Sequence, residues 1–359
     1  MSLKNKEIMK SKLFKGGKKQ PVEQTTRITT DTLAEHREQV LAGGRKFKYP
    51  IQYQRHRLVI NTVIIAFIAL VLLIGIGWYL LYVAKNTSEF MYRVTKVVPV
   101  PVAIVDGQPV AYSDYLMKYR SAAHYLTEKE QIDVNSNDGK SQLAYVQTKA
   151  MDDAIADAYA VKLADDHHIT VSDADLEVFL KQQRASNDGE VSEATYETVI
   201  KDYYNWTQAE FREAMKDKLL RQKVAYAVDT DRAKLVKQLQ PRLAVSGVDL
   251  SSIAAELNAK KDNTASYMPP EWVPKSNQDG GLAKAAASLK KGEVSSAVKT
   301  TSGNGYYFVR LVDSNETQVQ YEYLFIPLQT FDNMLAKVKK DNKLTTFITI
   351  NEESTSTKQ

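Results

Sequence analysis

The chain of 359 residues contains no cysteine. It therefore has no disulfide, no thiol nucleophile and no thiolate ligand for a metal ion. Histidine is also scarce, and the adjacent pair His167 and His168 suits a solvated helix end better than a metal site, because neighbouring side chains on a helix point about 100° apart. A phosphate-binding glycine loop, a Gly-x-Ser-x-Gly motif and zinc-ligand spacings are absent from the sequence as well. We predict no metal and no cofactor.

One region of the sequence lacks charge altogether, from Leu58 to Ala84. A bilayer core takes about 20 apolar residues, so this run is long enough to span a membrane with some tilt. The aromatic residues Trp78, Tyr79 and Tyr82 gather at its far end, where amphipathic rings favour the membrane interface. A buried core helix is rarely so uniformly apolar, and a cleavable signal peptide has a shorter apolar region and a better cleavage site. We predict a transmembrane helix at 58–84 that acts as an uncleaved signal anchor.

The charges on the two sides of this run differ. Residues 1–57 carry 14 Lys and Arg against 5 Asp and Glu, whereas the remainder carries 34 against 38. Positive flanks stay in the cytoplasm, so we predict a single-pass cell-membrane protein with a basic, largely disordered cytoplasmic tail at 1–57 and an extracytoplasmic C-terminal part. Since the basic tail adjoins a membrane span, it indicates topology and not a nucleic-acid partner.

The residues after the span are predicted to form a stalk at 85–99, and a helical region is predicted to follow up to residue 228. The region opens with a short strand, an Asp106-Gly107 turn and a returning strand, after which Ser113 is predicted to cap a helix. Ser172 and Thr207 are predicted to cap two later helices, and Glu210 completes a capping box with Thr207.

This order of motifs resembles a known family. The stretches VDGQPVAYSDY, DAIADAYAVKLADDHHI, VSDADLE and WTQAEFREAMKDKLLRQKV occur in the order found in the N-terminal chaperone domain of SurA-, PrsA- and PpiD-type foldases. The resemblance covers 100–228. It implies a mostly helical domain that binds unfolded or nascent exported polypeptides, with secretion machinery as a further candidate partner.

The next part of the chain, 229–313, resembles the parvulin-type prolyl isomerase (PpiC) domain that follows the chaperone domain in those foldases. Residues 291–295 (KGEVS) and 298–300 (VKT) match its turn and strand, and 247–250 (GVDL) matches an earlier turn. The fold class implied for the whole chain is α+β: one N-terminal transmembrane helix, a helical SurA-like domain and a small α+β parvulin-like domain.

Isomerisation at an X-Pro bond must cross a barrier of about 20 kcal/mol, so a catalyst binds the twisted amide better than the planar one. The resemblance implies how parvulins do this, with two histidines, a Cys or Asp, and an apolar pocket for the proline ring. The first histidine position belongs on the first strand of the domain and falls around Ala225 or Tyr226, and the second falls on Tyr307. All five histidines of the chain lie at or before His168, so neither family histidine is present.

The other site positions that the resemblance to parvulins implies are partly kept and partly altered in this sequence. The Cys or Asp position falls on Asp262 and is kept. The pocket positions fall near Gln278 and on Leu282. Trp272 stands where the family has Gly-Trp, but Glu271 replaces the glycine. Read without the resemblance, Asp262 is a turn or helix cap and Tyr307 an ordinary half-buried strand tyrosine.

Two interpretations of this altered site remain. Asp262 and Tyr307 preserve a weak isomerase, or the fold is kept as a peptide-binding module without efficient catalysis; we favour the second, because fold alone does not confer activity. The function predicted is therefore a membrane-tethered extracytoplasmic chaperone or foldase that binds unfolded exported chains, with a weak or lost isomerase site. The alternatives are an active peptidyl-prolyl isomerase and a scaffold subunit of an envelope or secretion complex.

The last part of the chain, 314–350, is predicted to form a strand around Tyr323 followed by an amphipathic helix, and 351–359 a disordered tail. One interpretation returns this segment to pack on the N-terminal domain, as in the chaperone family. The other makes YLFIP an extra sheet strand, since it resembles the first strand of a parvulin repeat with Tyr323 at the histidine position.

Overall fold

A computed structural model of the chain describes residues 30–186, 189–245, 247–260 and 264–350. The chain forms two compact units, Met1–Gly77 and Trp78–Gln359, and each is described by itself. In the first, helix α1 runs over Thr30–Trp78. Residues 30–57, predicted to belong to a largely disordered tail, are therefore helical, since good helix formers such as Leu33, Glu38 and Leu41 dominate the start. Residues 1–29 and 351–359, including the predicted C-terminal tail, lie outside the described residues.

The stretch His56–Val83 is long and apolar enough to cross a membrane, and the side chains of its most apolar part are not buried inside the protein. It overlaps the predicted span 58–84 almost completely. One such helix near the N-terminus is compatible with a membrane anchor.

The second unit begins with the last turn of this apolar stretch. The π-helical turn η1, Tyr79–Val83, buries Leu81, whose carbonyl accepts a hydrogen bond of 2.7 Å from the hydroxyl of Tyr112. Helix α2, Glu89–Val97, follows at once and buries Met91 and Tyr92 against the same core. The residues predicted as a stalk, 85–99, thus contain a packed helix.

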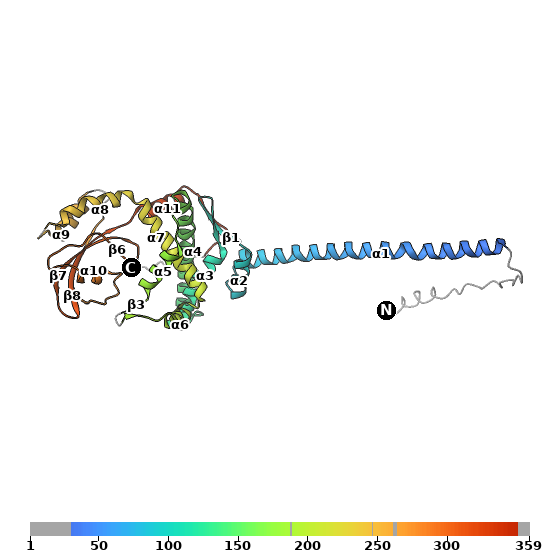
Figure 1. The fold of residues 1–359 in the computed structure, drawn as a ribbon, viewed down its shortest axis with the longest axis horizontal. Coiled ribbons are helices and arrows are strands. Elements are labelled where there is room, and N and C mark those ends of the chain that lie inside the picture. The colour runs from blue at the N-terminus through green and yellow to red at the C-terminus, as the bar shows by residue number, and fades with distance from the viewer. Residues whose placement is uncertain (1–29, 187–188, 246, 261–263, 351–359) are drawn as a thin grey trace, which may run out of the picture. The chain divides into compact units, whose positions relative to one another are not determined.

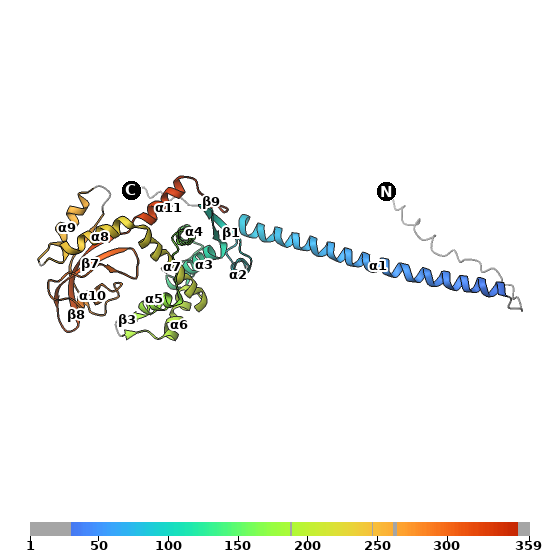
Figure 2. The same ribbon diagram turned by 45° about the horizontal axis from the view of Figure 1, so that its top comes forward.

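A hairpin comes next, formed by β1, Pro101–Val105, and β2, Gln108–Ala111. Asp106 and Gly107 both have positive φ, 46° and 86°, as the predicted tight turn requires. Strand β9, Leu344–Thr346, pairs with β1 and gives the order β2-β1-β9. The C-terminal segment therefore returns to the N-terminal domain, which confirms the first interpretation of that segment (Figure 2).

Helices make up most of this part of the chain (Figure 1). Ser172 and Thr207 cap α5 and α7 as predicted, and both form complete capping boxes, of which only that of Thr207 was predicted. The predicted cap at Ser113 is wrong: α3 begins at Tyr112, because β2 runs directly into the helix and the N–H of Tyr112 bonds to the carbonyl of Val100. The elements are α3 (Tyr112–His124), η2 (Tyr125–Lys129), α4 (Asn137–Asp166), α5 (Asp173–Gln183), β3 (Ala185–Ser186), β4 (Gly189–Glu190), α6 (Glu193–Tyr204) and α7 (Gln208–Val228).

The helical domain, defined here as residues 78–228 and 330–350, is closed by helix α11, Thr330–Lys340. Its Phe331 and Val338 are buried in the same core as α4, and the ring of Phe331 lies 5.8 Å from that of Tyr159. The predicted amphipathic helix is therefore confirmed, with its apolar face on the N-terminal core.

The sheet domain, residues 230–327, follows α7 in the chain. Its antiparallel sheet has the order β5-β8-β7-β6, so YLFIP lies in a central strand, which confirms the second interpretation of that segment. Helices α8 and α9 cover one face and α10 the other (Figure 1). The elements are α8 (Thr230–Leu243), α9 (Leu250–Asn258), β5 (Ser266–Pro274), α10 (Leu282–Ala287), β6 (Val298–Lys299), β7 (Gly305–Ser314) and β8 (Gln318–Pro327).

One buried carboxylate joins the two domains. Asp229 is 1% exposed and caps α8 by accepting from the N–H of Arg232. Its other oxygen accepts from the N–H groups of Gln329 and Thr330, at 2.8 and 3.2 Å, where β8 leads into α11. The chain passes between the two domains twice, after α7 and before α11, and Asp229 is hydrogen-bonded at both places.

Candidate functional site

The position of the second family histidine, Tyr307, lies on the sheet face that carries α10. Residues alternate between faces along a strand, so Tyr307 shares this face with Tyr321, Tyr323 and Phe325 of β8. Tyr307 pairs with Phe325 across the strands, and their rings stack at 4.5 Å. The ring of Tyr323 meets that of Tyr307 edge-on at 5.4 Å. We call these four side chains the aromatic face.

The hydroxyl groups of this face are tied to its own surroundings. Tyr307 donates to Asn304 Oδ1 at 3.1 Å, and its side chain is buried. Tyr321 donates to Asp279 Oδ2 at 2.6 Å, and burial together with this carboxylate raises the pKa of Tyr321. Asp279 also accepts from the backbone N–H of Ala283 in α10. The aromatic face is therefore packed and hydrogen-bonded within the sheet domain.

Other residues singled out from the sequence fall in different places. Leu282, the first residue of α10, is 4% exposed and belongs to the same apolar cluster as Tyr307. Trp272 on the edge strand β5 is 41% exposed, and Gln278 is exposed in the loop before α10, so neither joins that cluster. Asp262 lies outside the described residues.

The expected strand position of the first histidine, around Ala225 or Tyr226, is wrong, because both residues lie in helix α7. Tyr226 packs edge-on against Tyr306 at 5.2 Å and donates to the carbonyl of Gly305 at 2.6 Å. The alternative position, Tyr323 on β8, lies beside Tyr307 instead. The two tyrosines at which the resemblance places the family histidines, Tyr307 and Tyr323, are thus in contact.

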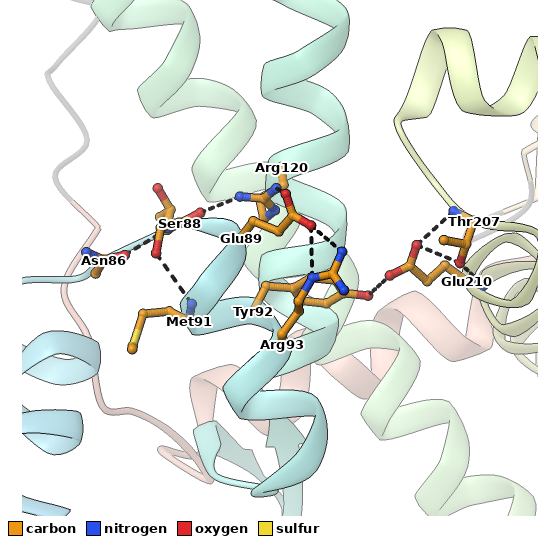
Figure 3. A network of polar contacts seen from close by, with 10 residues as sticks. Asn86, Ser88, Glu89, Met91, Tyr92, Arg93, Arg120, Thr207 and Glu210 are labelled. Carbon is orange, nitrogen blue, oxygen red and sulfur yellow. Dashed lines mark hydrogen bonds and ion pairs between the residues drawn. The ribbon is translucent and has the colours of Figure 1, made fainter. Parts of the chain in front are cut away.

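An open groove of about 570 Å³ lies in the helical domain between α2, α3 and the loop that joins α6 to α7. We call it the helical groove. Its floor includes Tyr92, whose hydroxyl donates to Glu210 Oε1 at 2.6 Å (Figure 3). Burial raises the pKa of Tyr92, and its carboxylate partner adds to this. Burial raises the pKa of Glu210, but the hydrogen bonds that its carboxylate accepts from Tyr92 and Thr207 outweigh burial, so the pKa of Glu210 is lowered.

Charged side chains form one rim of the helical groove. Glu89 accepts from Nε of Arg93 at 2.9 Å and lies 3.9 Å from the guanidinium of Arg120. Arg120 also donates to the carbonyl of Thr87 at 3.0 Å (Figure 3). These contacts fix α2 on the helical domain and leave an alternating charged rim around an aromatic floor.

The opposite wall of the helical groove is aromatic. Tyr204 and Trp206 stack with ring centroids 5.0 Å apart, and both line the groove. The indole N–H of Trp206 is buried with no hydrogen-bond acceptor among the described residues. A flat aromatic pair at the wall of an open groove suits an extended peptide, whose side chains pack on rings.

A second groove, also of about 570 Å³, runs along the junction of the two domains. The two domains are in close contact here, since Gln222 donates to the carbonyl of Thr301 at 2.9 Å. A side chain at position 303 would clash, because a Cβ on Gly303 would come within 2.2 Å of the Gln222 side chain. We call it the junction groove. Its apolar lining includes Ala156, Ala225, Phe325, Pro327, Leu328 and Phe331.

Sequence reasoning missed both grooves. The capping box at Glu210 and the aromatic stretch DYYNW were visible, but their neighbour Tyr92 lies 118 residues earlier in the chain than Glu210. Among the described residues, no group of three His, Cys, Asp or Glu side chains is arranged to hold a metal ion.

Comparisons with known proteins match both domains. The family model of the SurA-like N-terminal domain matches residues 51–225, and that of the PPIC-type PPIase domain matches residues 196–322. These matches define a class of protein in which a SurA-like chaperone domain precedes a PPIC-type domain. The chain has the architecture of the SurA-, PrsA- and PpiD-type foldases, and its α+β fold class is as predicted.

Further similarity is distant. A solved structure from work on PEB4 and Cj1289, described as two structurally related SurA-like chaperones of Campylobacter jejuni, is 14% identical. The match covers 67% of this chain and 92% of the chain in that structure. Its TM-score of 0.27 is too low to establish a shared fold over that length. No curated protein sequence matches the chain.

Proposed function

We propose that the protein is a membrane-anchored extracytoplasmic chaperone that holds unfolded exported polypeptides and has lost efficient prolyl isomerase activity. The pairing of a SurA-like domain with a PPIC-type domain supports a chaperone or foldase. The apolar stretch His56–Val83 is compatible with the anchor, and the charge difference between its flanks favours an extracytoplasmic chaperone.

The observation that carries the loss of isomerase activity is the packing of the aromatic face. A parvulin-type mechanism needs a pocket that admits the proline ring beside polar groups that reach the twisted amide. Here Tyr307 is 8% exposed, stacks on Phe325 and gives its hydroxyl hydrogen to Asn304. A proline ring would have to displace these side chains, so binding energy would be spent on opening the site.

The two grooves support the chaperone role. Each has the volume of a ligand site, and each combines apolar or aromatic walls with charged rims. Unfolded chains present mixed apolar and charged side chains without a fixed sequence, which such surfaces accommodate. We assign client binding first to the helical groove and second to the junction groove.

Two assays on the full chain in mild detergent test this proposal. We expect near-stoichiometric suppression of the aggregation of an unfolded client, together with isomerisation of a proline tetrapeptide at the uncatalysed rate. Isomerisation at a parvulin-like rate that Asp262→Ala abolishes would instead establish the active isomerase. Failure to suppress aggregation would remove the chaperone role and leave the scaffold subunit, whose mark is one stoichiometric partner on purification from membranes.

A further inference from the structure

Helix α2 has two different sides. Met91, Tyr92 and Thr95 are buried on the helical domain. At helical spacing on another side stand Phe90 and Val97, which are 69% and 82% exposed. These are among the most exposed large apolar side chains of the second unit, and a soluble surface gains nothing from them. Val97 also lines the edge of the helical groove.

The position of α2 on the helical domain is fixed, so this exposure is a property of the fold. Tyr92 donates to Glu210, Lys96 pairs with Glu213, and the carbonyl of Thr87 accepts from Arg120. Turning Phe90 and Val97 inward would break these contacts. The two side chains therefore stay exposed unless a partner from outside the described residues covers them.

The short connection between the apolar stretch and α2 indicates what this partner is. The apolar stretch ends at Val83, and five residues, 84–88, lead from it to α2. Five residues reach at most about 17 Å when fully extended, and here the backbone N–H of Asn86 is bonded to the carbonyl of Leu80, which shortens the connection. If the stretch spans the bilayer, α2 starts within the depth of the headgroup layer.

The chemistry of this side of α2 fits that layer. Arg93 lies between Phe90 and Val97 in the sequence of α2, at the rim of the helical groove, and its side chain is 75% exposed in an ion pair with Glu89. The long arginine side chain can keep its charge at the phosphates while its stem covers apolar surface. Amphipathic helices with aromatic or aliphatic residues on one side and basic residues at the edge lie in the interface, with the apolar side about 5–10 Å deep.

We propose that α2 is an interfacial helix: Phe90 and Val97 insert among the lipid headgroups of the outer leaflet, and Arg93 binds lipid phosphate. The contact uses the anchor of the proposed function and adds a second attachment. With both in place, the helical groove, which α2 also lines, is held at the membrane surface. An emerging client would meet it before leaving the bilayer.

The absence of cysteine makes the test direct. Single cysteines at Val97, Phe67 and Val178 are labelled with an environment-sensitive dye in the full chain, which is then placed in vesicles of phosphatidylcholine and phosphatidylglycerol without client. Phe67 is an exposed residue of the apolar stretch, and Val178 is a 60% exposed valine on α5 that serves as the matched control. Lipids with a nitroxide near the headgroup or deep in the acyl chain act as quenchers.

We expect the shallow nitroxide to quench Val97→Cys at least threefold more than Val178→Cys, and the deep nitroxide to quench Phe67→Cys. Adding Phe90→Ser should reduce the shallow quenching at Val97→Cys by about half or more. Equal quenching at positions 97 and 178, with Phe67→Cys quenched, overturns the inference and leaves the anchor intact. The inference also fails if dye at position 97 is shielded only when an unfolded client is added, since the exposed side of α2 is then a client surface. Loss of quenching at all three positions refutes the anchor itself.

Discussion

The helical groove and the aromatic face are both rich in tyrosine, but they differ in what their rings face. In the groove, Tyr204 and Trp206 stack at the wall of an open volume, and an indole N–H is left without an acceptor. On the sheet, Tyr307 stacks on Phe325 and its hydroxyl is already bonded. The same residue types therefore line an open groove in one domain and fill a core in the other, and the proposed function rests on this difference.

The largest expected effect concerns the fold of the sheet domain. Phe308 is fully buried on the face under α8 and α9, next in sequence to Tyr307 on the opposite face. We expect Phe308→Ala to lower the free energy of unfolding by about 4 kcal/mol, because it leaves a cavity, and Tyr307→Phe to cost about 1 kcal/mol or less, since it removes one hydrogen bond. Thermal unfolding of the full chain in detergent measures both. Equal costs would show that the aromatic face matters to the fold as much as the inner face does.

The second effect is a pH dependence of stability that we expect in the helical domain. Asp217 on α7 has its pKa raised to about 7, first by burial and then by the carboxylates of Asp157 and Asp114, with Lys118 acting in the opposite direction and Glu213 adding to the rise. An unfolded aspartate loses its proton near pH 4, so the folded chain binds more protons between about pH 4 and 7. Stability is therefore greatest below this window and is lost as pH rises through about 7.

We expect the helical domain to be less stable at pH 8 than at pH 5 by on the order of 2 kcal/mol from this group. Asp217→Asn should flatten the dependence, whereas Asp231→Asn, a side chain 89% exposed, should not. Hydrogen exchange of α3, α4 and α7 at the two pH values is the measurement. A steeper dependence in Asp217→Asn would contradict the assignment.

The third effect concerns client binding. Trp206→Ala removes the stacked ring from the wall of the helical groove, and we expect about tenfold weaker client binding, or about 1.4 kcal/mol. Titration of the full chain with a labelled unfolded client gives the dissociation constant. Tyr307→Phe is the matched control on the aromatic face and should bind as the natural chain does. If the control weakens binding and Trp206→Ala does not, the two regions have been assigned the wrong way round.

The smallest effect concerns the cap beside the groove. Thr207 accepts from the N–H of Glu210 and donates to its carboxylate, which also accepts from Tyr92. Thr207→Ala should cost about 1 kcal/mol of stability and leave the groove open. Thr207→Ser, which keeps the hydroxyl, should restore most of this in the same unfolding measurement.

Features set by neighbours in sequence were predictable. The cap at Ser172, the capping box of Thr207 and the Asp106-Gly107 turn depend on contacts within four residues, and the structure confirms them. The cap at Ser113 was missed because the start of α3 is set by a contact with Val100, which the local sequence does not encode.

Features set by distant residues were not predictable to the same degree. The sheet takes a central strand, β8, from beyond residue 313, where the parvulin-like domain was predicted to end. Tyr226 was expected on a strand, but the helix propensity of the run before it extends α7 to Val228. The helical groove joins α2 to α7 across more than a hundred residues, so no local pattern indicates it.

The most direct test of the central claim is hydrogen exchange of the full chain with and without an unfolded client. We expect slower exchange at 89–97 and 204–210, around the helical groove, and unchanged exchange in β7 at 305–311. Protection confined to β7 and the aromatic face, with none around the groove, would contradict it.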